Sequence, residues 1–484
     1  MNAVFAILSF QAVVGAFDNL WHHEWQARLP QRVSARKELR LHAAREALYA
    51  GLFLALAWSE WHGGWALLLG GVLLAEFGIT IADFLEEDRS RRLPPLERAL
   101  HTALAVSYGA FLALMLPVLQ RWWQQPAAIV PVQHGALSWL FTLFAVAVAM
   151  WSLRNLRAVG RLQQAVQEAA TGPTVALTPR PATLVSGATG FIGSRLVKAL
   201  VAEGERVVVW ARDPVQAQAQ FGAGVIVVGG LDELPPELPV RRVVSLAGAP
   251  VLGLPWTAAR RRLLIASRVN TTAALVQWMR SRPVPPEVLV SASAVGYYGV
   301  PAEGEEVDED APAQPGRFQS DLCAAVEHEA RRAEALGVRV VRLRFGIVLG
   351  HGGGAYPQLA LAARFGLGAV LGRGTQPMAW IHLQDALGLI HFALAEARLR
   401  GPVNAVAPQP VTHAQFTDAL ARSVRRPRWL RTPGWVLRAA LGEMSELLLE
   451  GQRVQPRVAR EAGYAFRFGS LQAALQDLAA RRLS

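Results

Sequence analysis

The chain has a single cysteine, Cys323, among its 484 residues. One cysteine excludes a disulfide within the chain and any metal site built from several thiolates. Lysine is almost as scarce, because Lys37 and Lys198 are the only two. The formal charge of +12 does not form a stripe of interleaved basic and aromatic residues, so nucleic-acid binding is not predicted.

Long hydrophobic runs fill the first third of the chain. A helical bilayer crossing needs roughly 20 predominantly apolar residues. The candidate spans are Met1 to Phe17, Ala47 to Ser59, Gly63 to Ala82, Ala99 to Leu119 and Gly135 to Leu153. The first run follows no basic segment and has a poor cleavage site, so it predicts a retained span rather than a signal peptide. We expect a transmembrane domain of about five spans, although Ala47 to Ser59 is short.

Basic residues alternate between the two sides of these spans. The connection Glu60 to His62 has none, and Gln120 to His134 has only Arg121. The remaining flanks are rich in them: Arg28, Arg32, Arg36, Lys37, Arg40 and Arg45; Arg89, Arg91 and Arg92; Arg154, Arg157 and Arg161. The positive-inside rule then predicts a multi-pass protein of the cell (inner) membrane, with its N-terminus outside and the nucleotide-binding domain that follows the last span cytoplasmic.

A chain of this length is too long for one hydrophobic core. Composition divides it into a transmembrane helical domain (1–155), an arginine-rich helix and linker (156–182), a nucleotide-binding domain (183–412) and a helical C-terminal domain (413–484). Strands are expected at Arg206 to Trp210, Val225 to Val228, Arg242 to Leu246, Val288 to Ser291 and Arg339 to Arg344. Their alternation with helices predicts an α/β domain with a Rossmann-type doubly wound parallel sheet, which follows an all-α bundle.

The segment Leu184 to Gly193 (LVSGATGFIG) combines a short strand, three glycines spaced three apart and the start of a helix. Gly187 permits a sharp turn, Gly190 allows a pyrophosphate to approach the backbone, and Gly193 lets the helix pack on its strand. The first helical amides then point at phosphate. A structural glycine turn is the alternative. The predicted cofactor-binding residues are Gly187, Thr189, Gly190, Phe191, Ile192, Gly193, Arg212, Ala247 and Gly248.

Arg212 and Asp213 follow the second expected strand, where an acidic residue would bind the ribose of NAD. A guanidinium at this place can pair with the 2′-phosphate of NADP. We therefore expect NADP(H), while Asp213 keeps NAD(H) as the less favoured alternative.

Several further segments resemble the extended short-chain dehydrogenases/reductases, specifically their epimerase-like branch. These segments are Ser245 to Gly248, Ser291 to Gly299 (SASAVGYYG), Arg344 to Gly350 (RFGIVLG) and Trp380 to Asp385 (WIHLQD). Leu441 to Met444 and Gln452 to Pro456 are similar to a bacterial family of sugar-nucleotide epimerase-like proteins with a helical C-terminal domain of unknown function. The resemblance covers Thr183 to about Phe468 and leaves out the hydrophobic first third.

The resemblance implies catalysis by a Ser, a Tyr and a Lys four residues after the Tyr, in which the Lys lowers the pKa of the phenol. This chain departs from that pattern, because Phe318 to Glu327 contains neither a phenol nor an amine. Lys198 lies instead on the helix after the glycine loop. Ser291, Ser293 and Tyr298 remain as catalytic candidates, and packing of Tyr298 as an ordinary loop aromatic is the alternative.

Four residues are candidate substrate contacts: Trp256, Arg268, Trp380 and His382. A guanidinium and a stacking face suit a phosphate or a sugar. The tryptophans could equally be core residues, and His382 could order a loop. The loop His351 to Tyr356 is predicted either as a mobile segment beside the substrate or as a plain turn, and the acidic run Glu303 to Asp310 as a solvated loop.

Acidic and histidine residues recur at a spacing of four in the hydrophobic third. The pairs are Asp18 with His22, Glu38 with His42 and Glu46, and Glu97 with His101. Together with Asp83 they are expected near the cytoplasmic ends of the spans. His22, His42 and His101 are weak metal-ligand candidates, but such pairs also stabilise helices, so no metal is assigned. Glu76, alone in an apolar span, marks the expected bundle interior.

These patterns predict a membrane-anchored NADP(H)-dependent oxidoreductase or epimerase-like protein. It would act at the cytoplasmic face on a carbonyl, hydroxyl or sugar-nucleotide-like substrate. The alternative is a non-catalytic NADP(H) sensor coupled to the membrane domain, which the missing Tyr and Lys favour. The bilayer is the only partner that the sequence predicts, and the substrate and oligomeric state are left open.

Overall fold

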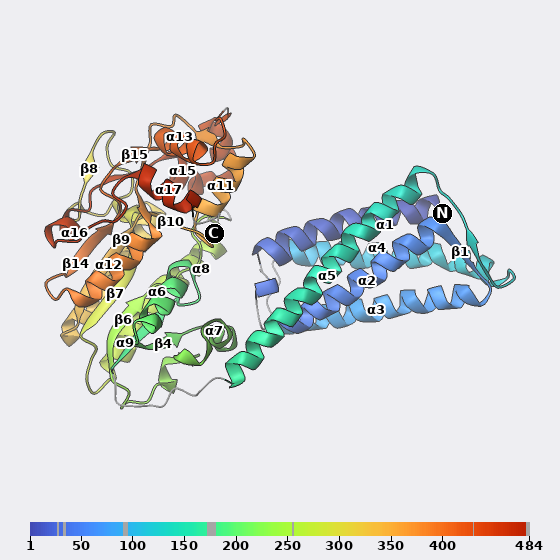
Figure 1. Cartoon of the computed structure of the whole chain (residues 1–484), viewed down its shortest axis with the longest axis horizontal. Helices are drawn as coiled ribbons and strands as arrows, with labels where there is room; N and C mark the ends of the chain where they lie inside the picture. Colours follow the sequence, from blue (N-terminus) through green and yellow to red (C-terminus); the bar gives the residue numbers. More distant parts are fainter. Residues whose placement is uncertain are drawn as a thin grey trace. The chain divides into compact units, whose positions relative to one another are not determined.

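The computed structural model describes residues 1–26, 29–31, 35–90, 95–171, 181–253, 256–428 and 430–480. The chain forms two compact units, a helical unit that ends with α5 and an α/β unit that begins with β3 (Figure 1). Most of the predicted linker, residues 172–180, lies outside the described residues. Each unit is described by itself.

The helical unit is an antiparallel bundle (Figure 1). Its helices are α1 (Asn2–Asp18), η1 (Asn19–Gln26), η2 (Leu29–Gln31), α2 (Arg36–Trp58), α3 (Gly64–Ser90), α4 (Pro95–Trp123) and α5 (Ala136–Thr171). Strands β1 (Ser59–His62) and β2 (Ala128–Pro131) pair antiparallel. The core is aromatic, with the ring of Phe141 5.0 Å from that of Phe5 and 5.4 Å from that of Phe53.

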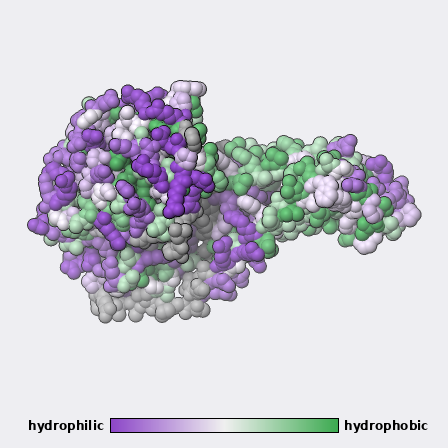
Figure 2. All heavy atoms as spheres, turned by 45° about the horizontal axis from the view of Figure 1, so that its top comes forward, coloured by the Kyte–Doolittle hydropathy of each residue, from purple (hydrophilic) through white to green (hydrophobic). Residues whose placement is uncertain are grey.

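Among the residues that the structure describes, four helical segments are long and apolar enough to cross a membrane. They are Asn2–Glu24, Gly64–Glu87, Leu96–Trp123 and Ala136–Gln164. Large apolar side chains also face outward, such as Leu74 with 70% and Leu143 with 64% of their surface exposed. Figure 2 shows this hydrophobic surface along the helical unit, whereas the visible face of the α/β unit is largely hydrophilic.

The remaining predicted span, Ala47 to Ser59, forms the second half of α2 and ends at the first residue of β1; α2 is not one of these four segments. The first half of α2 carries Lys37, Arg40 and Arg45. The sequence predicts a connection there, but the structure has these residues on the helix. These charges leave only the second half of α2 apolar. Helix α2 nevertheless packs along α5 as a full member of the bundle.

The α/β unit contains a seven-stranded parallel sheet with the order β14-β9-β7-β6-β3-β4-β5. Its strands are β3 (Ala182–Ser186), β4 (Arg206–Trp210), β5 (Val225–Val228), β6 (Val240–Ser245), β7 (Val288–Ala294), β9 (Arg339–Phe345) and β14 (Gly401–Ala405). The predicted Rossmann-type fold is confirmed. The strand order reverses at β3, because β4 and β5 follow on one side of it and β6 lies on the other. Doubly wound folds bind their ligands at the carboxyl ends of the strands at this switch point, between β3 and β6.

Helices cover both faces of this sheet. Helices α6 (Phe191–Ala202) and α12 (Leu383–Ala395) contact each other, α6 on β3 and β4 and α12 on β7 and β9. Helices α9 (Thr271–Arg280) and α10 (Phe318–Arg331) pack on the other face, where Met279 and Ala330 join Leu289 of β7 in one core cluster. Near-continuous Val and Leu in the strands follow from burial on both faces.

The C-terminal region is helical, as predicted. It contains α13 (His413–Ser423), α14 (Gly434–Leu441), α15 (Glu446–Leu449), α16 (Arg457–Glu461) and α17 (Leu471–Ala480). Asp385 of α12 is buried and accepts hydrogen bonds from the backbone amides of Arg467 and Phe468 at 2.8 and 2.9 Å. This carboxylate fixes the last segment of the chain to the sheet domain.

A buried ion pair joins the sheet to α10. Arg344 of β9 donates from Nε to Glu327 Oε1 at 2.8 Å and from Nη2 to Glu327 Oε2 at 3.0 Å. Both side chains are 2% exposed. Such a pair holds its two elements in register, because removal of one partner leaves an uncompensated buried charge.

We expect Glu327→Ala to destabilise the α/β unit by about 3–5 kcal/mol, the usual cost of breaking a buried pair. Thermal and denaturant unfolding of the full-length protein in detergent measures this loss. The matched control is Glu396→Ala, which removes a surface carboxylate paired with the exposed Arg398 and should leave unfolding unchanged. Equal effects of the two substitutions would contradict the assignment.

Candidate functional site

The turn between β3 and α6 has the geometry of a dinucleotide cradle. Gly187 has φ +71°, and a Cβ there would lie 2.5 Å from the backbone of Leu246. A Cβ on Gly193 would overlap the carbonyl oxygen of Gly187. Gly190 is the N-cap of α6, so the amides of Phe191 and Ile192 have no acceptor within the helix. Only glycines fit this turn, and it directs free amides to the switch point.

Arg212 and Asp213 have different surroundings at the end of β4. Asp213 Oδ1 accepts a hydrogen bond at 3.0 Å from the amide of Gln216, in the first turn of α7 (Pro214–Phe221). Its carboxylate therefore caps a helix. Arg212 is exposed beside the carboxyl end of the sheet. This arrangement favours Arg212 over Asp213 as the group that meets the adenosine ribose.

The loop after β6 brings Ala247 and Gly248 next to Arg268. A Cβ on Gly248 would lie 2.8 Å from the guanidinium carbon of Arg268, and Arg268 Nη2 donates to the carbonyl of Ala249 at 2.8 Å. Burial lowers the pKa of Arg268. Of the four predicted substrate contacts, Arg268 alone provides a charged group at the carboxyl edge of the sheet.

Ser291 and Ser293 lie on one face of β7, which they share with α10. Ser291 is 2% exposed, and Ser293 Oγ donates to Glu327 Oε1 at 2.8 Å. Cys323 of α10 contacts Ser293, and burial together with the charge of Glu327 raises the pKa of its thiol to about 11. At neutral pH this thiol keeps its proton, so it is a poor nucleophile.

Helix α10 presents no phenol or amine to the end of β7. Gln319 approaches Gly296, and Cys323 approaches Ser293 one helical turn later. The sequence lacks the family's Tyr and Lys at this helix. In the fold, Gln319 and Cys323 lie near the end of β7 in their place, and α10 is described over its whole length.

The geometry assigns Tyr298 to packing. It is 3% exposed, its hydroxyl donates to Asn404 Oδ1 at 2.7 Å, and it accepts from Arg344 Nη1 at 2.9 Å. Burial raises the pKa of Tyr298 to about 12. The Tyr298 hydroxyl therefore forms its hydrogen bonds within the protein. This geometry favours packing of Tyr298 as a loop aromatic over a catalytic role.

Trp256, Trp380 and His382, for which the sequence left both substrate contact and a structural role open, have structural contacts. Trp380 is 1% exposed and donates from Nε1 to the carbonyl of Gln409, while Trp256 donates to the carbonyl of Val251. His382 Nδ1 accepts from the amide of Gln384 and so caps α12. The indole nitrogens and His382 Nδ1 thus bond to backbone groups, whereas His382 Nε2 lies 3.4 Å from Asp477 Oδ2.

The acidic run Glu303 to Asp310 is not a simple solvated loop. Glu309 is 4% exposed and accepts from the amide of Asn404 at 2.9 Å. Asp308 and Asp310 both pair with Arg457 of α16. The run therefore fastens the C-terminal region to the sheet.

The loop His351 to Tyr356 packs on the start of α6. A Cβ on Gly353 would lie 2.5 Å from the ring of Phe191, and Arg195 Nη2 donates to the carbonyl of His351. His351 Nε2 lies 2.6 Å from the carbonyl oxygen of Leu478. The loop connects the cradle helix to α17.

A cleft of about 1010 Å³ opens beyond the loop that follows β7. The residues that line it include Val300 and three arginines, Arg373, Arg438 and Arg453. Trp435, which is 71% exposed, also lines it. Glutamates 303, 305 and 450 also line it. Its guanidinium groups and exposed indole are suited to an anionic ligand with a flat ring.

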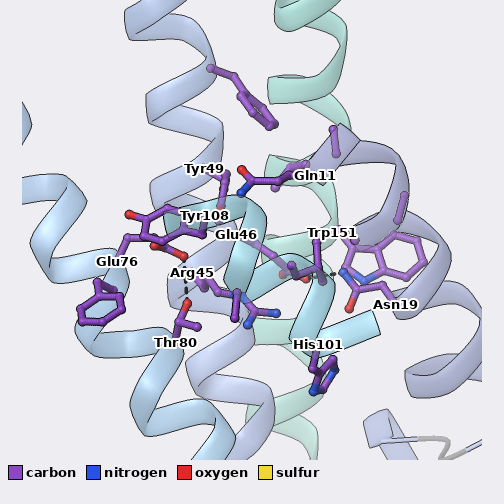
Figure 3. A pocket seen from close by; sticks show the side chains of 18 of the residues that line it. Gln11, Asn19, Arg45, Glu46, Tyr49, Glu76, Thr80, His101, Tyr108 and Trp151 are labelled. Carbon is purple, nitrogen blue, oxygen red and sulfur yellow. Dashed lines mark hydrogen bonds between the residues drawn. The ribbon is translucent and has the colours of Figure 1, made fainter. Parts of the chain in front are cut away.

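The helical unit brings together the polar residues that the sequence spaces by four. His101 Nε2 lies 3.0 Å from Asp18 Oδ2, and His42 Nε2 lies 3.0 Å from Asp83 Oδ2. His22 Nδ1 lies 2.6 Å from Asp18 Oδ1. A cavity of about 360 Å³ reaches this cluster at His101. Figure 3 shows its polar lining, in which Thr80 Oγ1 donates to Glu76 Oε1 at 2.9 Å.

Comparison with known proteins identifies the α/β unit. Residues 183–405 match the NAD dependent epimerase/dehydratase family, and residues 432–478 match a domain of unknown function. An epimerase family protein of Bacillus subtilis, YfhF, is 36% identical over 301 residues, which cover 98% of that protein and 62% of this chain. The chain belongs to this epimerase family. The mouse protein SDR39U1 is likewise 36% identical, over 99% of its length and 61% of this chain.

Solved structures agree with this family assignment. Human SDR39U1, solved with NADPH, is 34% identical with a TM-score of 0.56, over 62% of this chain and 99% of that one. A nucleoside-diphosphate sugar epimerase of Corynebacterium glutamicum is 25% identical with a TM-score of 0.50, over 69% of this chain and 64% of that one. The cofactor expected from the sequence is the ligand of the first of these relatives.

Sequence reasoning missed Cys323, Glu327 and Arg344 as neighbours of Ser293. The only available signal was that Arg344 ends a strand and Glu327 lies on a helix face next to it. In the helical unit it missed His23 and Glu87, although Asp83 and Glu87 repeat the spacing of four that marks the other pairs.

Substitution of Gly193 tests the cradle. Gly193→Ala places a methyl group against the carbonyl of Gly187, so α6 must move and the amides at its start lose their positions. We expect at least about tenfold weaker NADPH binding by calorimetry on the full-length protein. Gly469→Ala is the control, because a Cβ there meets no atom within 4 Å. NADPH affinity that Gly193→Ala leaves unchanged would refute the cradle.

Proposed function

We propose that the α/β unit is an NADP(H)-dependent oxidoreductase or epimerase that acts on a carbonyl or hydroxyl group of a sugar-nucleotide-like substrate. The glycine cradle at the switch point carries this proposal: Gly187 and Gly193 have no room for a Cβ against the neighbouring backbone, and the tight turn they form leaves the first amides of α6 free to bind a pyrophosphate. Bound NADP(H) would supply or accept a hydride at its nicotinamide. The NADPH in human SDR39U1 supports the choice of cofactor.

Residues at the end of β7 would hold the reacting oxygen. The hydroxyl of Ser293 donates a hydrogen bond to Glu327. The lone pairs of Ser293 Oγ are therefore left to accept a hydrogen bond from a substrate hydroxyl. Arg344 fixes the position of Glu327 through two hydrogen bonds. The protonated thiol of Cys323 adds a weak donor at the same place. Arg268 contributes positive charge near the loop after β6.

The arginine-lined cleft supports an anionic substrate. Arg373, Arg438 and Arg453 offer charge for a phosphate, and Trp435 offers an exposed face for a base or a sugar. The similarity to the nucleoside-diphosphate sugar epimerase agrees with this class of substrate.

Membrane anchoring is part of the same proposal. Four long apolar segments and their exposed leucines suit a bilayer. With α2 as a fifth crossing beside these four, the distribution of Arg and Lys in the sequence favours an N-terminus outside and the α/β unit in the cytoplasm, where NADP(H) is available.

A second candidate function is a non-catalytic NADP(H) sensor. One observation favours it: α10 carries Gln319 and Cys323 at the end of β7, without the phenol and amine of the family's usual chemistry. A sensor would bind NADPH with the same cradle and turn over no substrate.

Arg212→Ala tests the choice of cofactor. Loss of a charge-assisted contact with the 2′-phosphate should weaken NADPH binding by about 10- to 100-fold and leave NADH binding unchanged. Calorimetric titration of both nucleotides into the full-length protein measures this. The control is Arg241→Ala, because Arg241 lies near the amino end of β6, away from the carboxyl ends of the strands; this substitution should change neither affinity. A parallel loss for both nucleotides would contradict a role at the 2′-phosphate.

Ser293→Ala separates the enzyme from the sensor. A panel of nucleotide sugars is followed by NADPH absorbance, and by NMR for epimerisation, which causes no net change in NADPH. For an enzyme, kcat should fall about 100-fold in this variant, whereas Ser423→Ala, on α13, should retain it. NADPH binding without turnover of any member of the panel would favour the sensor.

A further inference from the structure

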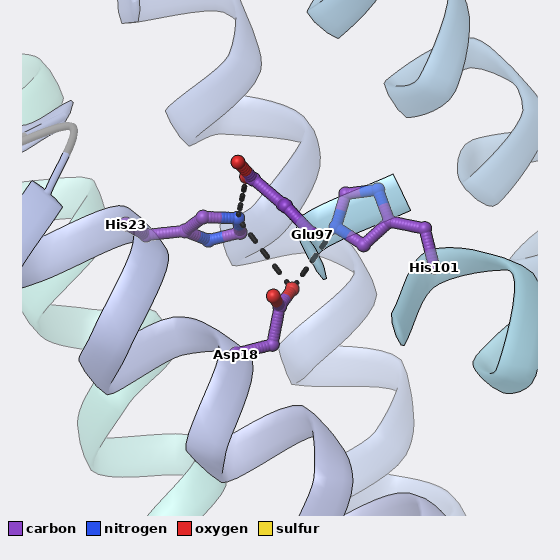
Figure 4. A group of neighbouring side chains, drawn as sticks. All are labelled: Asp18, His23, Glu97 and His101. Carbon is purple, nitrogen blue, oxygen red and sulfur yellow. Dashed lines mark hydrogen bonds and ion pairs between the residues drawn. The ribbon is translucent and has the colours of Figure 1, made fainter. Parts of the chain in front are cut away.

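The bundle interior contains a compact set of metal-ligand side chains, distinct from the nucleotide site. Asp18, His23, Glu97 and His101 each place one ligand atom within 4.8 Å of all the others. They come from the end of α1, from η1 and from the first two turns of α4, and all four are buried. In Figure 4, His23 lies between Glu97 and Asp18, and His101 approaches Asp18 from another side.

The distances fit one ion. Ligands about 2.0–2.1 Å from a tetrahedral ion lie about 3.3–3.4 Å from one another. His23 Nε2 is 3.4 Å from Glu97 Oε1 and 3.7 Å from Asp18 Oδ2, and His101 Nε2 is 3.0 Å from Asp18 Oδ2. Small side-chain adjustments complete such a shell.

The hydrogen bonds of His23 fix which nitrogen faces the cluster. Asn19 Nδ2 donates to Glu46 Oε1 at 3.3 Å, which orients the amide so that Asn19 Oδ1 faces His23 Nδ1 at 2.9 Å. Nδ1 therefore carries a hydrogen, so in a neutral His23 the lone pair of Nε2 faces the carboxylates. Nε2 is buried, lies 3.4 Å from Glu97 Oε1 and makes no hydrogen bond within the part of the chain that the structure describes. The carboxylates around it require a positive charge, which a proton on Nε2 or a metal ion can supply.

The other ligands are oriented in the same manner. His101 Nδ1 lies 3.1 Å from Glu87 Oε2, so its Nε2 is directed at Asp18. His22 Nδ1 holds Asp18 Oδ1 at 2.6 Å and leaves Oδ2 for the cluster. Histidine ligands of metals usually donate their second ring N–H to a carboxylate or carbonyl in this way.

From this geometry we propose that the helical unit binds one divalent first-row transition-metal ion through Asp18, His23, Glu97 and His101. Two imidazoles and two carboxylates without thiolate suit iron, manganese, cobalt or zinc, rather than calcium or magnesium. His42 and Glu87, which share His23 as a neighbour, lie beside the site and support it. The cavity that His101 lines gives small molecules room next to the ion.

The test uses full-length protein in detergent. Elemental analysis follows growth with iron, manganese, cobalt and zinc, and the chelator-treated protein is then titrated with Co²⁺ while its visible absorption is recorded. We expect one ion per chain, ligand-field bands typical of nitrogen and oxygen ligands, and at least about tenfold weaker Co²⁺ binding in His23→Gln and in the positioning variant Asn19→Ala. His62→Gln changes a buried histidine outside the cluster and should keep the ion.

Wild-type protein alone also decides the matter if the variants fail to fold. A bound ion should raise the Tm of the helical unit when Co²⁺ is restored to the chelated protein. Less than about a tenth of an ion per chain with no Tm change would overturn the site and leave His23 as a protonated partner of its carboxylates. Equal Co²⁺ binding by His23→Gln and wild type would overturn it too. Neither result depends on NADPH binding by the α/β unit.

Discussion

The pair of Arg344 and Glu327 organises the working edge of the α/β unit. Arg344 comes from β9 and Glu327 from α10, while Ser293 of β7 and Tyr298 of the following loop each bond to one of them. Through Tyr298 and Asn404 the network reaches β14 and the carbonyl of Gln455 in the C-terminal region. One buried guanidinium therefore relates three strands, a helix and the C-terminal region, and a shift of any of them would displace Ser293 from the end of β7.

The fold could be predicted because its determinants are local in the sequence. The predicted strands Arg206 to Trp210 and Val225 to Val228 have the bounds that the structure gives them, since apolar residues between turn signals suffice to define a buried strand. The glycine motif was equally local, because each glycine meets backbone within its own turn or the adjacent strand. Helix α2 was harder, since its charged first half reads as a connection until packing against α5 is known.

The site was predicted less completely because burial and partners depend on distant segments. Trp380 and His382 have the chemistry of substrate contacts, but Trp380 Nε1 bonds to the carbonyl of Gln409, and His382 lies with Nδ1 on the amide of Gln384 and Nε2 near Asp477. The sequence alone leaves the hydroxyl of Tyr298 without a partner, whereas in the fold it donates a hydrogen bond to Asn404, 106 residues later. Cys323 had no signal of its own, because its place beside Ser293 arises from the packing of α10 on β7. Residue type gives the possible chemistry, and only the fold shows which polar atoms remain unused.

That distinction also separates the two buried polar clusters of this protein. Around Arg344, guanidinium, carboxylate, phenol and amide groups bond to one another, so the network is explained by the positions it fixes. Around His23, the surrounding bonds turn Nε2 of the imidazole toward Asp18 Oδ2 and Glu97 Oε1, which lie 3.7 and 3.4 Å away. Ionisable groups in an apolar bundle are costly, and packing alone would favour leucine there. Asn19, His22 and Glu87 orient the side chains of this second cluster, and the ion that we propose would supply the positive charge that its carboxylates need.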